Sequence, residues 1–216
     1  MAQPSRNSDI HGKRQAIRQA AIRLFSTRGF AGTSTRELCD AASVTKPVLY
    51  HYFANKEALF RQLIEEALND YREGIHRAAA TAGSAEERFV EVVWNDFKFT
   101  RKEPELLRLL YRVVFAGELA VPAQTVVASA MQEMEVLLEV ARQGIRQGEW
   151  LGSPDEIALS VLGLSHIQTL RYLVGGEGRL SLAQARRCVE IALRGCATMP
   201  AASGRARAAA PQSKRS

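Results

Sequence analysis

The sequence of 216 residues has few cysteines and no long uncharged apolar run. Its three cysteines, Cys39, Cys188 and Cys196, are odd in number and lack C-x-x-C spacing, which argues against a disulfide framework and a zinc site. No uncharged apolar run approaches the roughly 18 residues of a membrane-spanning helix. The first residues, MAQPSRNSDI, lack the apolar stretch of a signal peptide. We therefore expect a cytoplasmic protein with free thiols, no membrane contact, and no metal or cofactor.

The sequence also lacks the alternation of apolar and polar residues that marks a half-buried strand. Apolar residues recur instead at spacings of three and four, and prolines or glycines separate these segments. We predict an all-α fold whose later helices cover residues 84–101, 104–116, 123–147, 155–174 and 181–197. No Walker loop, H-E-x-x-H motif or paired-carboxylate arrangement stands out, so the sequence does not indicate an enzyme.

Positive charge is concentrated at the two ends of the chain. Residues 1–62 hold 10 Lys and Arg against 4 Asp and Glu, whereas residues 63–200 hold 15 against 19. The segment 201–216 holds 4 basic residues and no acidic one. Such localisation indicates a phosphate-binding surface. We expect a disordered arm over 1–10, a helix-turn-helix DNA-binding domain over 11–60, a helical ligand-binding and dimerisation domain over 61–200, and a disordered basic tail over 201–216.

The stretch from Thr33 to Phe60 predicts two short helices joined by a tight turn, with another helix directly after them. Ser34 and Glu37 form an S-x-x-E capping box at the start of the first short helix. Thr45 offers a side-chain oxygen as the N-cap of the second, and Pro47 follows in its first turn. We therefore expect a three-helix unit here, completed by a preceding helix over about 12–27.

The second short helix has two different faces. Leu49 and Phe53 point to one side, whereas Lys46, Tyr50 and His51 form a cationic and aromatic surface on the other. A helix-turn-helix reader needs this arrangement, because one helix braces across the DNA backbone and the second lays its N-terminal residues against base edges in the major groove. An ordinary three-helix packing unit with a solvated face is the alternative.

The run T-x-R-E-L…A-x-V-T-K-P-V-L-Y-H-Y-F-x-N-K-E-A-L resembles the helix-turn-helix signature of the tetracycline-repressor (TetR) family of bacterial regulators. The resemblance covers roughly Lys13 to Leu63. It implies an all-helical homodimer with an N-terminal DNA-binding domain and a C-terminal domain for ligand binding and dimerisation. Ser43 departs from the pattern, since the family usually has Gly at this turn position. A left-handed Ser there costs on the order of 1 kcal/mol.

The predicted DNA contacts divide into phosphate and base contacts. Phosphates are assigned to Thr35, Arg36, Tyr50 and Lys56, and bases to Lys46, Pro47, Val48 and His51, with Ser34 and Thr45 at the helix starts on the same surface. Two copies of this surface would suit half-sites about one helical turn apart. The expected partner is therefore a palindromic double-stranded DNA operator.

The later helices are expected to form the dimer interface and a ligand pocket. The segment 155–174 is apolar around almost its whole circumference, so we expect it to meet a second copy together with 181–197. Burial within one chain is the alternative. The candidate pocket residues lie on helices that surround a ligand cavity in this family: Trp94, Phe97, Tyr111, Phe115, Met131, Met134 and His166. The same side chains at helical spacing also suit an ordinary core.

The function predicted from these features is transcriptional regulation. We expect a homodimer, with repression as the first expectation, that binds its operator and is released by a small apolar or aromatic effector. A helix-turn-helix protein without a small-molecule effector, acting as an activator or a constitutive regulator, is the alternative.

Overall fold

The computed structural model describes residues 6–116, 123–176 and 178–194. Within these residues the chain forms nine α-helices and no strand, which confirms the predicted all-α fold. The helices are α1 (Arg6–Arg28), α2 (Thr35–Ala42), α3 (Lys46–Tyr52), α4 (Lys56–Ala79), α5 (Ala85–Lys102), α6 (Pro104–Ala116), α7 (Ala123–Arg146), α8 (Pro154–Gly175) and α9 (Leu182–Arg194).

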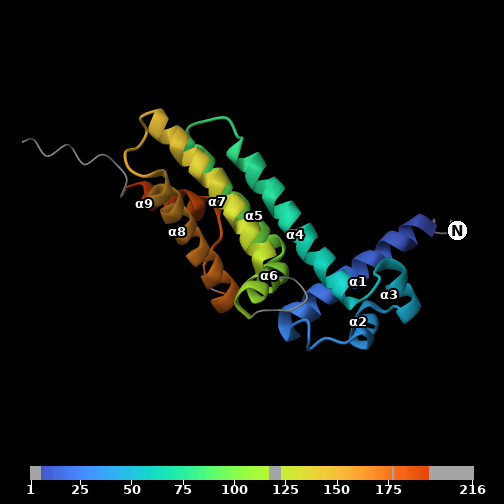
Figure 1. Cartoon of the computed structure of the whole chain (residues 1–216). Coiled ribbons are helices and arrows are strands. Elements are labelled where there is room, and N and C mark those ends of the chain that lie inside the picture. The colour runs from blue at the N-terminus through green and yellow to red at the C-terminus, as the bar shows by residue number, and fades with distance from the viewer. Residues whose placement is uncertain (1–5, 117–122, 177, 195–216) are drawn as a thin grey trace, which may run out of the picture.

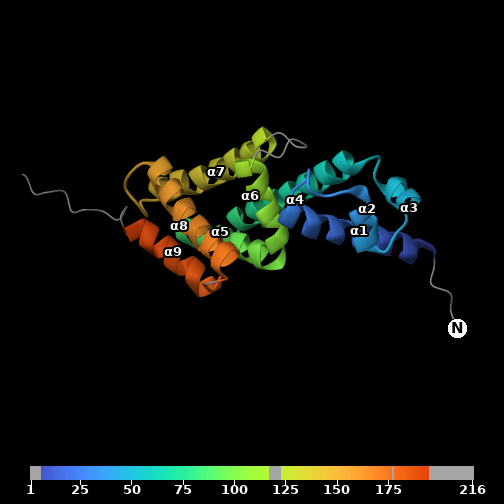
Figure 2. The same cartoon turned by 90° about the horizontal axis from the view of Figure 1, so that it is seen from below.

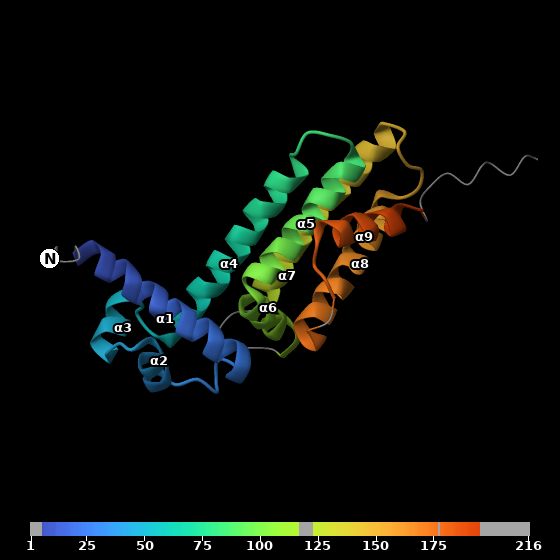
Figure 3. The ribbon, with the colours of Figure 1, turned by 180° about the vertical axis from the view of Figure 1, so that it is seen from behind.

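The molecule is elongated, with a small N-terminal lobe at one end and a larger helical bundle at the other (Figures 1 and 2). The N-terminal lobe consists of α1, α2, α3 and the beginning of α4. Helix α4 then continues out of this lobe and packs along α5 and α7. Figure 3 shows α8 and α9 on the side of the bundle away from α4. This arrangement leaves α2 and α3 at the far end of the molecule from α9.

The segment that forms α2, the turn and the start of α3 follows the sequence prediction in most details. Ser34 and Glu37 form the predicted capping box, with the Ser34 side chain accepting from the Glu37 N–H. Ser43 has φ 53° and ψ 43°, so the left-handed position holds a serine. Pro47 lies in the first turn of α3, as predicted, but the N-cap Thr45 makes no side-chain capping bond. The predicted capping role of the Thr45 hydroxyl is therefore corrected, because its oxygen does not bond the first turn of α3.

One further sequence expectation changes at the N-terminal end of the chain. The predicted disordered arm over 1–10 is helical from Arg6, because α1 begins six residues before the predicted start at Gly12. No Pro or Gly lies between Arg6 and Gly12 to stop the helix from extending in this direction. The first five residues, the predicted tail 201–216 and the end of the predicted segment 181–197 lie outside the described residues.

The core of the N-terminal lobe continues into the bundle without a break. Three rings, Phe25, Phe30 and Phe60, contact one another with centroids 5.0 to 5.9 Å apart. The same apolar cluster also contains Leu106 and Val113 of α6. The predicted domain boundary at residue 60 therefore falls inside both α4 and a continuous core. Burial of α6 against α1 ties the lobe to the bundle.

Helix α8 is the most apolar helix of the bundle. By length and composition alone it could cross a membrane, although it contains Asp155, Glu156 and Arg171 and so is not an uncharged apolar run. A third of its most apolar window is buried inside the chain, and α8 packs against α5, α7 and α9. The composition of α8 therefore has a partial explanation in packing within one chain.

Replacement of Ser43 by glycine should stabilise the protein, because glycine adopts the left-handed conformation without a Cβ clash. We expect Ser43→Gly to raise the free energy of unfolding by about 0.5–1 kcal/mol, measured by chemical denaturation. Ser153→Gly is the matched control, since Ser153 has φ −86° and also makes no side-chain capping bond. Equal effects of the two substitutions would contradict strain at Ser43.

Candidate DNA-binding surface and ligand cavity

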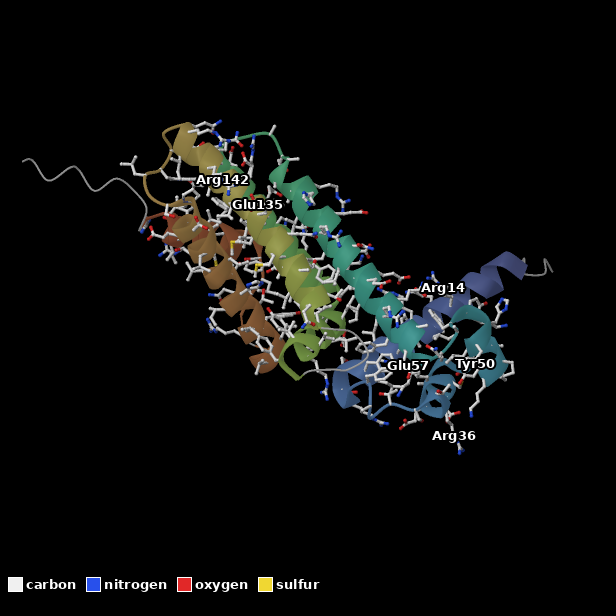
Figure 4. All side chains as sticks on the ribbon, viewed as in Figure 1. Arg14, Arg36, Tyr50, Glu57, Glu135 and Arg142 are labelled. Atoms are coloured by element: carbon white, nitrogen blue, oxygen red, sulfur yellow. The ribbon has the colours of Figure 1, made fainter. Side chains whose placement is uncertain are left out.

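The outer faces of α2 and α3 present most of the predicted DNA contacts to solvent. The side chains of Ser34, Arg36, Thr45, Lys46, Pro47, Tyr50 and His51 are exposed, whereas Thr35 and Val48 are half-buried. Figure 4 shows Arg36 and Tyr50 directed outward from the N-terminal lobe. Leu49 is fully buried and fixes the opposite face of α3 to the lobe core. The structure therefore places a polar, cationic and aromatic surface on a short, well-anchored helix.

Acidic neighbours reduce the charge of this surface only slightly. Arg36 lies 3.8 Å from Asp40, one turn along α2, and both side chains are largely exposed. Such exposed pairs contribute at most about 1 kcal/mol, so Arg36 can exchange Asp40 for a phosphate. Glu37 is held by Ser34 and by Arg28, whose guanidinium lies 2.6 Å away. Hydrogen bonds from Ser34 lower the pKa of Glu37, with a further contribution from Arg28.

Lys56 has a different position from the other predicted phosphate ligands. Its ammonium donates to the carbonyl oxygens of Phe30 and Thr33 at 2.9 and 2.8 Å and lies 4.1 Å from the centroid of the Phe30 ring. Two of its three N–H donors are therefore used inside the lobe. We revise its predicted role: Lys56 fixes the connection between α1 and α2 to the start of α4, and so positions the DNA-binding surface.

A cavity of about 350 Å³ lies where α4, α5, α6, α7 and α8 meet. Its wall is mostly apolar, with Leu107, Leu110 and Val114 from α6 and Val126 from α7. A volume in this range suits a small organic ligand. Leu110 and Val126 also belong to the core of the N-terminal lobe, so the cavity wall is continuous with that core.

Four of the seven predicted pocket residues line this cavity: Tyr111, Phe115, Met131 and His166. The prediction is corrected for the other three, because Phe97 is fully buried in the bundle core and Trp94 and Met134 pack against that core from its edge. Helical spacing alone does not separate these two environments, since both are apolar.

Four polar residues of the cavity wall were not among the predicted pocket residues. Tyr71, Asp96, Ser129 and Glu133 line it, and Asp96 and Glu133 are almost completely buried. A signal was present in the sequence: Asp96 continues the buried stripe of α5 formed by Phe89 and Val93, where an apolar residue is expected.

Three of these groups, Tyr71, Asp96 and Glu133, form one hydrogen-bonded network. The Tyr71 hydroxyl lies 3.2 Å from Asp96 Oδ1 and 3.0 Å from Glu133 Oε1. On the other side of Asp96, the Thr169 hydroxyl donates to Oδ2 at 3.1 Å. Burial raises the pKa of Asp96, although the His166 charge and the hydrogen bonds of Thr169 and Tyr71 oppose this effect. Burial, reinforced by the Asp96 charge, raises the pKa of Glu133 to about 8.

A second, larger space lies outside the bundle, as a groove of about 730 Å³ between α4, α5 and α7. Charged and amide side chains such as Arg72, Arg88, Glu135 and Glu139 form much of its wall. This groove is more open to solvent than the cavity, and more charged side chains line it, whereas ligand sites are usually enclosed. We therefore take the smaller cavity as the candidate ligand site.

Helix α6 connects the cavity to the N-terminal lobe through two apolar stripes. Leu106, Leu109 and Val113 belong to the core shared with α1 and α4. Leu107, Tyr111 and Val114 line the cavity. The two stripes follow the spacing of three and four on different sides of the helix. A change in the cavity that moves α6 therefore acts directly on the core under the DNA-binding surface.

Comparison with known proteins agrees with this architecture. Residues 17–63 match the family model described as bacterial regulatory proteins, tetR family. The chain is 26% identical over 159 residues to the probable HTH-type transcriptional regulator YttP of Bacillus subtilis, covering 73% of this chain and 75% of YttP. Several other relatives are matched over about half of their length or less.

Two solved structures have a similar fold. PfmR, a TetR family transcriptional regulator from Thermus thermophilus, superposes with a TM-score of 0.69 and 20% identity, over 82% of this chain and 97% of PfmR. AibR, solved in complex with isovaleryl coenzyme A and operator DNA, gives a TM-score of 0.62 and 21% identity, over 84% and 97%. The helix-turn-helix lobe and the helical bundle define a DNA-binding transcriptional regulator. Residues 17–63 are a DNA-binding domain of the tetR family of bacterial regulatory proteins, and the chain as a whole has the fold of solved members of that family.

Replacement of Glu133 by glutamine should stabilise the protein increasingly as the pH rises. The native state keeps a proton on Glu133 up to about pH 8, whereas the unfolded chain loses it near the ordinary value of 4.5. The free energy of unfolding of the wild type therefore decreases as the pH rises from 4.5 to about 8. Glu133→Gln avoids this loss, because glutamine does not ionise. We expect the variant to gain on the order of 2–4 kcal/mol over wild type at pH 8.5, and much less at pH 5.

Thermal denaturation of both proteins across this pH range measures the effect. Glu135→Gln is the control on the same helix, because Glu135 is exposed and pairs with Arg142 at 2.8 Å (Figure 4). A stability difference between wild type and Glu133→Gln that does not grow with pH would show that Glu133 is not held protonated.

Proposed function

We propose that this regulator acts as a homodimer that binds a palindromic operator through α2 and α3 and leaves the DNA when a small ligand occupies the bundle cavity. The observation that supports this most directly is the double role of α6, which lines the cavity and packs in the core beneath the DNA-binding surface. Binding rather than turnover is the proposed activity, and the bacterial cytoplasm is its proposed location.

The proposed DNA contacts follow from the exposed surface of α2 and α3. Lys46, Pro47, Val48 and His51 at the exposed side of α3 would face base edges in the major groove. Thr35, Arg36 and Tyr50 would contact phosphates on either side of it. The Ser34 and Thr45 positions lie at the helix starts, where backbone N–H groups favour a phosphate.

The proposed dimer forms through α8 with a contribution from α9. Three large apolar residues on one stripe of α8 are exposed in the single chain: Leu159 at 62%, Ile167 at 51% and Val174 at 86%. Ile191 of α9 is also exposed. Exposed apolar stripes of this kind are typical of protein interfaces. In a dimer with a two-fold axis, the stripe of each copy would be covered by the same residues of the other copy.

Repression is the proposed sense of regulation. A dimer whose two DNA-binding surfaces occupy successive major grooves excludes other proteins from the same site. A ligand removes the dimer only if it binds more tightly to a state in which the spacing of the two surfaces differs, because a ligand shifts an equilibrium by its differential affinity. Movement of α6 would change that spacing through α1 and α4.

Replacement of Lys46 by alanine should weaken binding to an operator selected from genomic fragments. We expect a loss of about 1–3 kcal/mol, because the substitution removes a donor placed for base edges. Fluorescence anisotropy at fixed salt measures the affinity. Arg142→Ala is the control, since it removes a cation at the opposite end of the molecule (Figure 4). Equal affinity of Lys46→Ala and wild type would refute the assignment of α3.

Replacement of Ile167 by glutamate should separate the proposed dimer. A charged group at the centre of an apolar interface is left desolvated and unpaired, so we expect a monomer at micromolar concentration by sedimentation. The helical circular dichroism should persist, and affinity for the palindromic operator should fall. Leu151→Glu is the matched control, because Leu151 is similarly exposed, at 59%, but lies after α7. A wild-type protein that sediments as a monomer would contradict the proposal directly.

A further inference from the structure

The cavity contains two acidic side chains that form no ion pair with a lysine or arginine of the described residues. Asp96 from α5 is 5% exposed and Glu133 from α7 is 8% exposed, and both line the cavity. Within the described residues neither carboxyl group makes an ion pair. Buried carboxylates are unfavourable unless they are paired or protonated. Any ligand that brings a compensating positive charge therefore stabilises the ionised form of these carboxyl groups.

Hydrogen counting shows that the two carboxyl groups share a proton through Tyr71. The Tyr71 hydroxyl has one hydrogen, yet it lies within hydrogen-bonding distance of both Asp96 and Glu133. It can donate to one of them only, so the other must donate to the phenol oxygen. Asp96 is the acceptor, because the Thr169 hydroxyl donates to its other oxygen and the His166 charge favours its ionised form, so the proton stays on Glu133, whose pKa is raised by burial. The resting network is thus Glu133 to Tyr71 to Asp96, with Thr169 donating to the other Asp96 oxygen.

The network still has unused acceptor capacity that faces the cavity. Glu133 Oε2 has no hydrogen-bond partner among the described residues, although the side chain is more than nine-tenths buried. Tyr111 and Phe115 line the same cavity with their rings stacked at 6.0 Å and 11°. Aromatic faces attract cations at exposed sites as well as at buried ones, and Phe115 is 79% exposed. An unpaired carboxyl oxygen and aromatic rings together form the environment that binds an ammonium group.

We propose that the cavity selects a ligand with an apolar or aromatic body and a protonated amine, which binds against Asp96 and Glu133. This inference rests on the proposed function, because it names the chemical class of the effector. An ammonium supplies up to three N–H donors, which can bond Glu133 Oε2 and replace the proton shared through Tyr71. Glu133 then ionises and its proton passes to solvent, so each amine that binds releases a proton.

An anionic ligand does not match the same wall. A carboxylate in this cavity would meet the charge of Asp96 in a site of low polarity, where like charges repel strongly. Among the described residues that line the cavity, His166 is the basic side chain that could pair with an anion. Its charge already interacts with Asp96. Within the described residues, the acidic and histidine side chains also do not form a group of three that could hold a metal ion. An organic cation is therefore favoured over both alternatives.

Three probes with the same phenylbutyl body test the inference: phenylbutylamine, phenylbutanol and phenylpentanoate, which carry an ammonium, a hydroxyl and a carboxylate. Titration calorimetry on the full chain without DNA measures binding near pH 7. We expect the amine to bind at least tenfold more tightly than the other two. Repetition in two buffers with different ionisation enthalpies should show release of about one proton per amine bound, and the amine affinity should rise with pH up to about 8.

Several groups surround Glu133 and bear on this proton release. They are Tyr71, Arg72 and His76 on α4, Asp96 on α5, Tyr111 on α6 and His166 on α8. Two nearly isosteric variants isolate the carboxyl pair from the others. Asp96→Asn should weaken amine binding at least tenfold, and Glu133→Gln should abolish the proton release. Glu135→Gln on the outer face of α7 should change neither quantity (Figure 4).

The outcomes separate this inference from the proposed function. Absence of amine binding, equal or tighter binding of phenylpentanoate, or unchanged amine binding by Asp96→Asn would each overturn the ligand class. Denaturation of each variant establishes that it is folded. DNA release is measured separately with whichever probe binds. A carboxylate that binds and releases the operator would leave the proposed regulator intact and refute the amine. An amine that binds without releasing DNA would support the ligand class and refute the proposed release from the operator.

Discussion

Helix α6 is buried on two sides, and the rest of the molecule depends on this constraint. One stripe, with Leu106 and Val113, fills the core beneath α1 and α4. The other, with Leu107 and Tyr111, closes the cavity. Protein interiors are close-packed, so a side chain cannot move at one stripe without a response at the other. The lobe and the bundle are thus a single packed unit, although the sequence pattern suggested a boundary at residue 60.

The local structure could be predicted from the sequence because its signals are short-range. The capping box of Ser34 and Glu37, the proline in the first turn of α3 and the helical periods of α5 to α9 depend only on neighbouring residues. The role of Lys56 could not be predicted in this way. Its partners are the carbonyl groups of Phe30 and Thr33, more than twenty residues away, and a lysine beside a helix start has the same sequence pattern whether it faces DNA or folds back.

The candidate cavity was predicted only in part for a related reason. Aromatic and methionine residues at helical spacing suit both a core and a cavity wall, so Phe97 and Phe115 could not be distinguished before the helices were placed. The acidic residues were the more informative signal. A carboxyl group on the buried stripe of an otherwise apolar helix is unfavourable unless it has a partner, and Asp96 and Glu133 lie on two different helices that meet at the same cavity.

The buried acids also bear on how a ligand signal reaches the DNA. Tyr71 joins the two carboxyl groups and lies on α4, which begins at the DNA-binding lobe. Under the proposed function, a ligand that ionises Glu133 would change the hydrogen bonding of Tyr71, and one that fills the cavity would contact Tyr111 on α6. Both helices pack in the lobe core through Leu68 and Leu110, which also line the cavity. A ligand can therefore bias the lobe through charge on α4 and through volume on α6, and the two effects converge on the same apolar contacts.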